Sequence, residues 1–191
     1  MGVRLMRCII RILEKLWLLT GAERSEFDDS ENLYFDSIGL NLLKTPECWG
    51  YWCTPTNTVS FATTSGDGVH FGFLCQEGIS LDESPIVMTL PSADTSNIIV
   101  GENLLDFLSL GCRAGYFELE LIEYEPEFHI PIMDSQSYSE EATKEEIQLL
   151  KLIESEFNLK PWVGHASRLL ELKNKYLEQL EFSEEYYELT T

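Results

Sequence analysis

The segment VSFATTSGDGVHFGFLC, residues 59–75, decides the fold of this chain. In its first part, Val59 and Phe61 alternate with small residues. In its last part, 69–75, apolar side chains recur at every second position, the spacing that places them on one face of a strand. The residues between, 64–68, include two glycines, which accept the positive φ of a tight turn. The segment therefore predicts an antiparallel β-hairpin.

Further strands and two helices are predicted after the hairpin. Residues 85–91 form an apolar run bounded by prolines, and residues 98–100 form a shorter apolar run. Residues 103–110 predict a helix with Gly111 as its C-cap. Residues 116–123 alternate like a strand, but their Glu and Leu content favours a helix, which is the interpretation adopted.

The first 20 residues predict a basic amphipathic helix. Its apolar residues surround a stripe of cations spaced three or four apart, Arg4, Arg7, Arg11 and Lys15. Such a helix could lie on a membrane surface. We prefer a terminal helix that packs on its own domain, with its basic stripe beside an acidic body.

A pair of helices is predicted within residues 140–182. The first, 143–157, begins with Thr143 and Glu146, which have the spacing of a capping box. The second, 161–182, begins with a proline, which suits the first turn of a helix. These helices extend the chain beyond the strand-rich part.

The whole chain, 1–191, is expected to form a single α+β domain. A small, mainly antiparallel sheet and its closing helix would occupy residues 49–122, flanked by the N-terminal helix and the C-terminal helical extension. Residues 22–47 and the region of the two prolines at 126 and 131 predict loops. The acidic tail, 184–191, is expected to be frayed.

The chain is strongly acidic, with 13 Lys and Arg against 33 Asp and Glu and a net charge of −20. Residues 21–133 alone hold 19 acids and three bases, a net of −16. Such a field repels nucleic-acid phosphates and anionic lipid, so we expect no nucleic-acid partner and no membrane. It favours a basic protein as partner, the alternative being that the charge serves solubility alone.

The five cysteines indicate a reducing compartment. Their number is odd and they form no Cys-x-x-Cys pair, so no disulfide framework is expected. The apolar stretch near the N-terminus is interrupted by charges and has no cleavage site, which argues against a signal peptide or a membrane span. A cytoplasmic location follows as the expectation.

Two chemical interpretations of the segment 48–75 are disfavoured. A nucleophilic pair of Cys53 and His70 needs a lowered thiol pKa, whereas acidic and apolar surroundings raise it. A zinc site made of these two residues with Cys48 and Cys75 lacks the paired short spacing of structural zinc ligands. We therefore expect no catalytic residue, no metal and no cofactor, and we interpret His165 as a surface histidine in the first turn of a helix.

Six residues are candidates for a partner-binding surface. Exposed aromatic side chains are favoured anchors in interfaces, although we expect at least two of the three aromatics here to be core. Asp67 and His70 form the best polar pair. The six candidates are Trp49, Tyr51, Trp52, Asn57, Asp67 and His70.

The order of these elements resembles the SUKH superfamily of bacterial immunity proteins. The resemblance covers about residues 30–122 and rests on an acidic loop, short strands around the turn Gly66-Asp67-Gly68, and a closing segment, 103–108, with a Phe-Leu pair. The segment 49–53 and the helices after residue 131 depart from the family's pattern.

The resemblance implies a non-catalytic protein that neutralises a toxin domain, often a nuclease. A nuclease must be basic to hold a phosphate backbone, which agrees with the acidity of this chain. The function expected is therefore that of an acidic binding protein for a basic toxin. The alternative is a small-ligand-binding or hydrolytic domain with a pocket near Asn57, Asp67 and His70.

Overall fold

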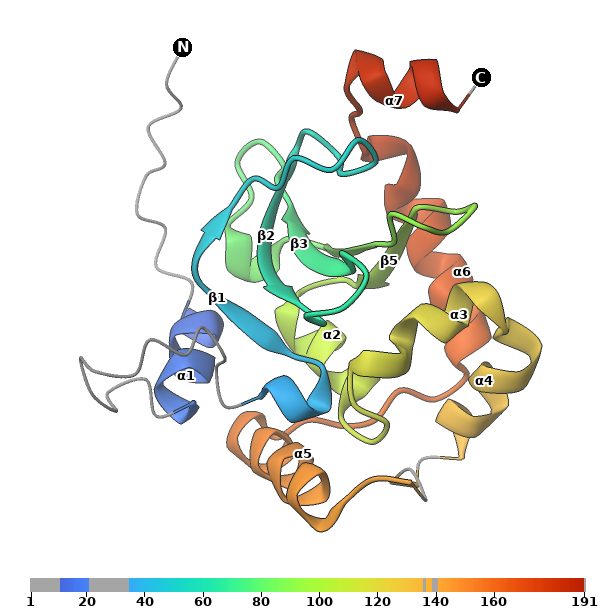
Figure 1. The fold of residues 1–191 in the computed structure, drawn as a ribbon. Coiled ribbons are helices and arrows are strands. Elements are labelled where there is room, and N and C mark those ends of the chain that lie inside the picture. The colour runs from blue at the N-terminus through green and yellow to red at the C-terminus, as the bar shows by residue number, and fades with distance from the viewer. Residues whose placement is uncertain (1–10, 21–34, 136, 139–140, 191) are drawn as a thin grey trace.

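A five-stranded antiparallel sheet forms the centre of the molecule (Figure 1). The computed structural model describes residues 11–20, 35–135, 137–138 and 141–190. Each strand pairs with the next one in sequence, and helices from both ends of the chain surround the sheet, which confirms the α+β class. The strands are β1 (Asn41–Glu47), β2 (Thr58–Thr63), β3 (His70–Leu74), β4 (Ile86–Thr89) and β5 (Asn97–Gly101).

Strands β2 and β3 form the predicted hairpin. Val59 pairs with Phe73 and Thr63 pairs with His70, with a register shift after Ser60. All five residues of β3 are buried, so both faces of this strand are covered. The alternation in the sequence therefore placed the strand correctly, but it did not identify a solvent-facing side.

Strand β1 corrects the prediction of a loop over residues 22–47, as far as the described residues reach. Leu42 is buried in the core, while the following residues of this edge strand are more exposed and include Pro46. Helix α1 (Arg11–Leu19) contacts the strand through Trp17, whose indole nitrogen donates a hydrogen bond to the Leu43 carbonyl oxygen (3.0 Å).

Helix α1 packs on the body of the protein as expected, since Leu13 and Leu16 are fully buried. Lys15 forms an ion pair with Glu156 (3.2 Å). Arg11 begins α1 and is exposed, whereas the other two cations of the predicted stripe, Arg4 and Arg7, lie outside the described residues. None of the described helices is both long and apolar enough to cross a membrane.

Helix α2 (Leu104–Gly111) closes the sheet. The Asn103 side chain caps its first turn by accepting a hydrogen bond from the Asp106 amide (3.0 Å). The Phe107 ring packs on the ring of Phe71 with a centroid distance of 4.8 Å. Gly111 is not the predicted C-cap, because it stays helical and the left-handed residue is Gly115 (φ 83°).

The region after α2 is helical throughout. The 3-10 turn η3 (Phe117–Glu120) and helix α3 (Leu121–Tyr124) confirm the helical interpretation of residues 116–123. The predicted loop around the two prolines is wrong: helix α4 (Pro126–Asp134) begins with one proline and contains Pro131.

The C-terminal helices were predicted in part. Helix α5 (Lys144–Phe157) has the predicted capping box, with both reciprocal hydrogen bonds present. Helix α6 (His165–Tyr176) begins four residues later than predicted, after Gly164 in a left-handed conformation (φ 70°). The short turn η4 (Leu177–Gln179) follows. Helix α7 (Glu184–Leu189) replaces the predicted frayed tail.

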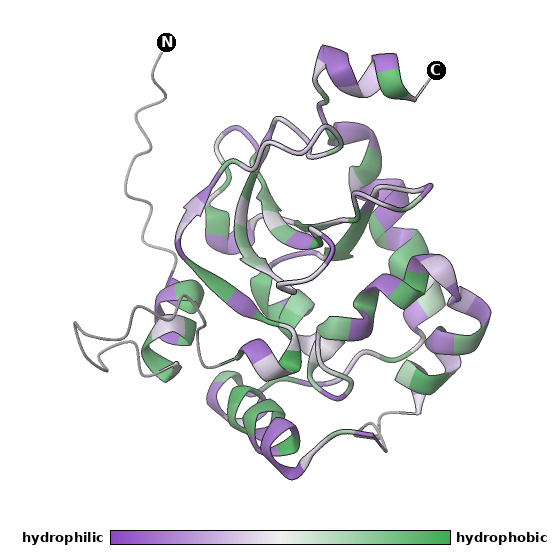
Figure 2. Ribbon diagram, in the orientation of Figure 1, coloured by the Kyte–Doolittle hydropathy of each residue, from purple (hydrophilic) through white to green (hydrophobic). Residues whose placement is uncertain are grey.

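The buried hydrophobic residues form one cluster that includes residues from α1, the sheet, α2, α5 and α6. Figure 2 shows hydrophobic residues along the strands and on α2, and a mixture of hydrophobic and hydrophilic residues on α5. Helix α5 is therefore amphipathic, with Leu149, Leu150 and Ile153 as its buried residues.

Candidate functional site

Two of the predicted aromatic residues pack around His70. The ring of Trp49 lies 4.8 Å from the His70 ring and the ring of Tyr51 lies 5.7 Å from it, measured between centroids. Tyr51 also covers Gly68 (φ 81°), where a Cβ atom would lie 2.8 Å from the tyrosine oxygen. The expectation that most of the aromatics are core is wrong: Tyr51 is exposed, and Trp49 and Trp52 are half-buried.

His70 is buried and packs against the rings of Trp49 and Tyr51. Its side chain is 1% exposed, and its two ring nitrogens contact the Gly68 carbonyl oxygen (2.7 Å) and the Thr54 hydroxyl (3.1 Å). Burial lowers the pKa of His70, so the ring is neutral at pH 7. The described contacts of His70 do not include Asp67, which is exposed, so the predicted polar pair does not form.

Trp52 and Asn57 face the C-terminal segment instead. The ring of Trp52 stacks on Tyr186 with a centroid distance of 5.9 Å. The Asn57 amide nitrogen donates to the Gln179 carbonyl oxygen (2.8 Å), and its carbonyl oxygen accepts from the Glu181 amide (3.0 Å). The side chains of Asn57, Asp67 and His70 therefore do not converge on one pocket.

Asp67 belongs to a group of carboxylates next to the aromatic residues. Burial and the charge of Asp67 raise the pKa of Glu120. Burial also raises the pKa of Tyr124, as do four neighbouring carboxylates, those of Glu120, Asp67, Glu123 and Asp94. Within the described residues, none of the four forms an ion pair with lysine or arginine.

We call these two groups together the acidic aromatic surface. It consists of Trp49, Tyr51, Asp67, Asp94, Glu120, Glu123 and Tyr124. Asp67 relates the two groups, because it directly precedes Gly68, which Tyr51 covers, and because its charge acts on Glu120. Four of the seven residues carry a carboxylate and the other three are aromatic.

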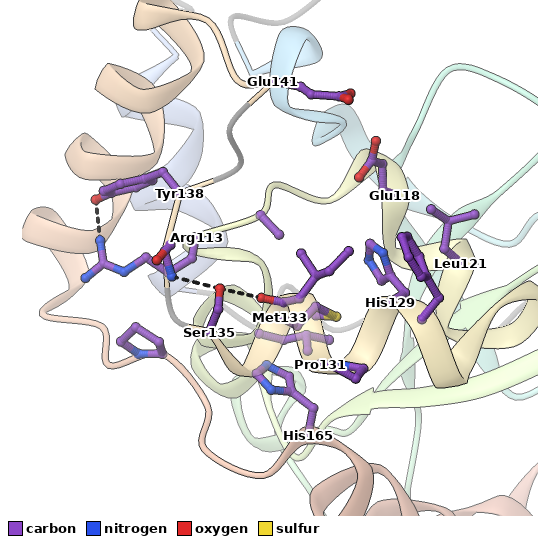
Figure 3. Close-up of a pocket in the computed structure, with 16 residues that line it drawn as sticks. Arg113, Glu118, Leu121, His129, Pro131, Met133, Ser135, Tyr138, Glu141 and His165 are labelled. Carbon is purple, nitrogen blue, oxygen red and sulfur yellow. Dashed lines mark hydrogen bonds between the residues drawn. The ribbon is translucent and has the colours of Figure 1, made fainter.

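A second feature is a cavity of about 760 Å³ between the end of α2, α4 and the start of α6 (Figure 3). We call it the histidine cavity, because it contains two of the three histidines of the chain. Its polar lining residues are Arg113, Glu118, His129, Ser135, Ser137, Tyr138, Glu141 and His165, and its apolar ones include Leu110, Leu121, Phe128, Pro131, Ile132 and Met133.

His165 is fixed in the cavity wall by Asp134 at the end of α4. Its Nδ1 atom lies 2.5 Å from Asp134 Oδ1, which also accepts hydrogen bonds from the amides of Gly164 (3.1 Å) and His165 (3.0 Å). These hydrogen bonds, that of the His165 ring above all, lower the pKa of Asp134. His165 is 2% exposed, so the prediction of a surface histidine is wrong.

His129 is the other histidine of the wall. It is 3% exposed, and its Nε2 atom has no hydrogen-bond partner among the described residues. Burial lowers its pKa, and nearby His165 does so too, whereas the carboxylates of Glu118 and Glu125 act in the opposite direction. Figure 3 shows the ring extending into the cavity below Glu118.

Arg113 is held at the rim of the cavity. Its two terminal nitrogens each lie 2.6 Å from an oxygen of Glu154, and one of them also donates to the Tyr138 hydroxyl. That hydroxyl donates in turn to Glu154 (3.0 Å). The guanidinium charge is therefore neutralised by the protein itself.

The histidine cavity was not predicted from the sequence. His129 and His165 are 36 positions apart, and the prolines around His129 were interpreted as marking a loop. The available signal was the pairing of an acid at the end of one helix, Asp134, with a histidine at the start of another. That pairing becomes visible only when the two helices are placed together.

Metal binding and thiol catalysis find no support in the geometry. Within the described ranges, no group of three or more His, Cys, Asp and Glu side chains could hold a metal ion. Burial raises the pKa of Cys53, as expected, and this opposes nucleophilic activation. The acidic aromatic surface and the histidine cavity are therefore the two candidate binding sites of the described residues. Comparison of the chain with protein-family models, with curated proteins and with solved structures found no match in any of the three.

Proposed function

We propose that this protein is a non-catalytic immunity protein of the SUKH type, which neutralises a basic toxin, such as a nuclease, by binding it at the acidic aromatic surface. The observation that carries the proposal is the set of carboxylates without cationic partners beside exposed aromatic rings. The proposal places the protein in the cytoplasm with its target.

Four cations of the described residues, Lys15, Arg113, Arg168 and Lys175, form ion pairs elsewhere in the molecule. Arg168 pairs with Glu102 and Asp106, and Arg113 pairs with Glu154. The carboxylates of the acidic aromatic surface have no such compensation. Burial raises the pKa of Glu120, and repulsion by the Asp67 carboxylate raises it further. A basic partner would relieve this repulsion when it binds.

The aromatic part of the surface suits the same partner. Tyr51 is 43% exposed and lies beside Trp49 with 5.9 Å between ring centroids. Arginine and lysine side chains bind favourably over the faces of such rings. Because His70 and Gly68 hold the rings in place, little ordering is needed on binding.

The test is titration calorimetry with the basic protein encoded by the neighbouring open reading frame, at 50 and 500 mM salt. We expect affinity to fall at least tenfold at the higher salt, because the attraction between exposed charges is screened. The double variant Asp67→Asn/Glu120→Gln should bind at least tenfold more weakly than the parent. A double variant with the same charge change elsewhere, Glu178→Gln/Glu188→Gln, should stay within about threefold.

Two results would overturn the proposal. One is an affinity that does not change with salt. The other is an equal loss of affinity in the two double variants, which would show that only the net charge matters. A Tyr51→Ala variant provides the separate test of the aromatic contact and should lose affinity without changing the salt dependence.

A further inference from the structure

We propose that the histidine cavity is a binding site for a small organic amine, with the ammonium group among the carboxylates and histidine nitrogens of the wall and the apolar part of the ligand against α3 and α4. This site is separate from the acidic aromatic surface, and the proposal does not depend on the toxin.

The unpartnered ring nitrogen of His129 is the first observation. A buried polar atom without a hydrogen bond costs free energy, and in folded proteins such atoms usually have a partner. Nε2 of His129 has none among the described residues, and its ring lies in the wall of a cavity large enough for a ligand. A molecule in the cavity would supply the missing partner.

The charged donors of the wall are already engaged by the protein. The terminal nitrogens of Arg113 are bound by Glu154 and Tyr138. The Nδ1 atom of His165 is likewise engaged, because it lies 2.5 Å from Asp134 Oδ1. An ammonium group, with three donors and no acceptor, complements such a wall.

The charge of the wall points to the same class of ligand. Glu118 contributes an exposed carboxylate, and the charge of Arg113 is already neutralised by Glu154. An anion would be repelled by the Glu118 carboxylate. A neutral His129, whose pKa is lowered mainly by burial, adds no positive charge that would oppose an amine.

The apolar side chains that line the cavity favour a ligand with a hydrophobic part. Phe128 and Ile132 line the cavity although they are 69% and 46% exposed, and Leu121 lies beside them. Exposed hydrophobic side chains around a concave site are typical of ligand binding. The cavity volume of about 760 Å³ is ample for an aromatic amine.

The test uses three indoles that differ in charge: tryptamine, the neutral alcohol tryptophol and the anion indole-3-propionate. Binding to the full chain is measured by titration calorimetry, and the nitrogen shifts of the His129 ring are followed by NMR. We expect tryptamine to bind at least tenfold more tightly than the other two and to shift the His129 Nε2 resonance.

Two variants locate the site. Glu118→Gln should weaken tryptamine binding at least fivefold, because it removes one carboxylate of the wall. Glu127→Gln is the matched control on the exposed part of α4, since Glu127 does not line the cavity, and it should bind as the parent does. Glu118 is exposed, so its replacement leaves the fold intact, which a thermal melt would verify.

The proposal is overturned if tryptophol or indole-3-propionate binds as tightly as tryptamine. It is equally overturned if Glu118→Gln has no effect, or if neither tryptamine, tyramine nor phenethylamine shifts the His129 resonance at 10 mM. Failure of the amine test leaves the toxin-binding test unaffected, because the two sites share no residue.

Discussion

Replacement of Gly111 by alanine should destabilise the protein, although alanine is the better helix former. Gly111 is the last residue of α2, and a Cβ atom there would lie 2.3 Å from the nearest carbon of the Tyr116 ring. Carbon atoms in contact lie about 3.5–4.0 Å apart, so the ring would have to move by more than 1 Å. Tyr116 is fully buried, and its hydroxyl donates to the Leu108 carbonyl oxygen (2.9 Å). The ring is therefore not free to move.

The size of the effect follows from two opposing contributions. Alanine in place of glycine in a helix stabilises by about 1 kcal/mol. Overpacking a core costs about 1–3 kcal/mol, and the upper end applies here because the Tyr116 ring is held on several sides, with the Phe107 ring 5.1 Å away. The net expectation for Gly111→Ala is a loss of about 2 kcal/mol, which corresponds to a decrease in Tm of about 4–8 °C.

The assay is urea unfolding combined with a thermal melt. Gly50→Ala is the control, since nothing lies within 4 Å of a Cβ atom at that position, and it should leave the stability unchanged or slightly increased. The double variant Gly111→Ala/Tyr116→Leu should lose less than the sum of the two single losses, because the smaller side chain removes the clash. If Gly111→Ala is as stable as the parent, the packing argument is wrong.

Three further predictions concern a helix cap, the C-terminal segment and pH. Thr143→Ala should cost about 1 kcal/mol in urea unfolding, because it removes the cap of α5, whereas Ser155→Ala on the same helix should cost less than half of that. Asn57→Ala removes two hydrogen bonds to the C-terminal backbone, so amide hydrogen exchange should become faster in residues 177–190 and not in α5; equal exchange in parent and variant would contradict the role assigned to Asn57. Burial lowers the pKa of His70 and His129 below the unfolded value of 6.5, so protons bind more readily to the unfolded chain. Stability should therefore be constant above about pH 7 and decrease between pH 7 and 5.5, and an unchanged urea midpoint across this range would refute it.

The strands of the hairpin could be predicted from the sequence because alternation and glycine-rich turns are local signals. Strand β1 was missed because its burial pattern is irregular and it contains Pro46, which is tolerated only because the strand is at the edge of the sheet. Helix α4 was missed for a similar reason, since Pro131 lies within it. In both cases the position of the element in the fold allows a proline that its local sequence would disfavour.

The candidate site could be predicted only in part. The contacts of Trp49 and Tyr51 with His70 agree with the grouping made from the sequence, but Trp52 and Asn57 turned out to contact the C-terminal segment. No sequence pattern predicts that a residue near position 57 contacts one near position 180. The histidine cavity depends in the same way on the approach of α4 and α6, which local sequence does not encode.

The order of the strands sets when each part of the molecule can form during synthesis. Because every strand pairs with its sequence neighbour, all five strands are available for pairing as soon as Gly101 has left the ribosome. Its last strand, β5, rests against α6 in the finished protein, and at about 5–20 residues per second the end of that helix follows roughly 4–15 s later. During this interval the apolar edge of β5 is open to strands of other chains. The yield of correctly assembled protein should therefore respond to translation speed and chain concentration more strongly than to the stability of the final fold.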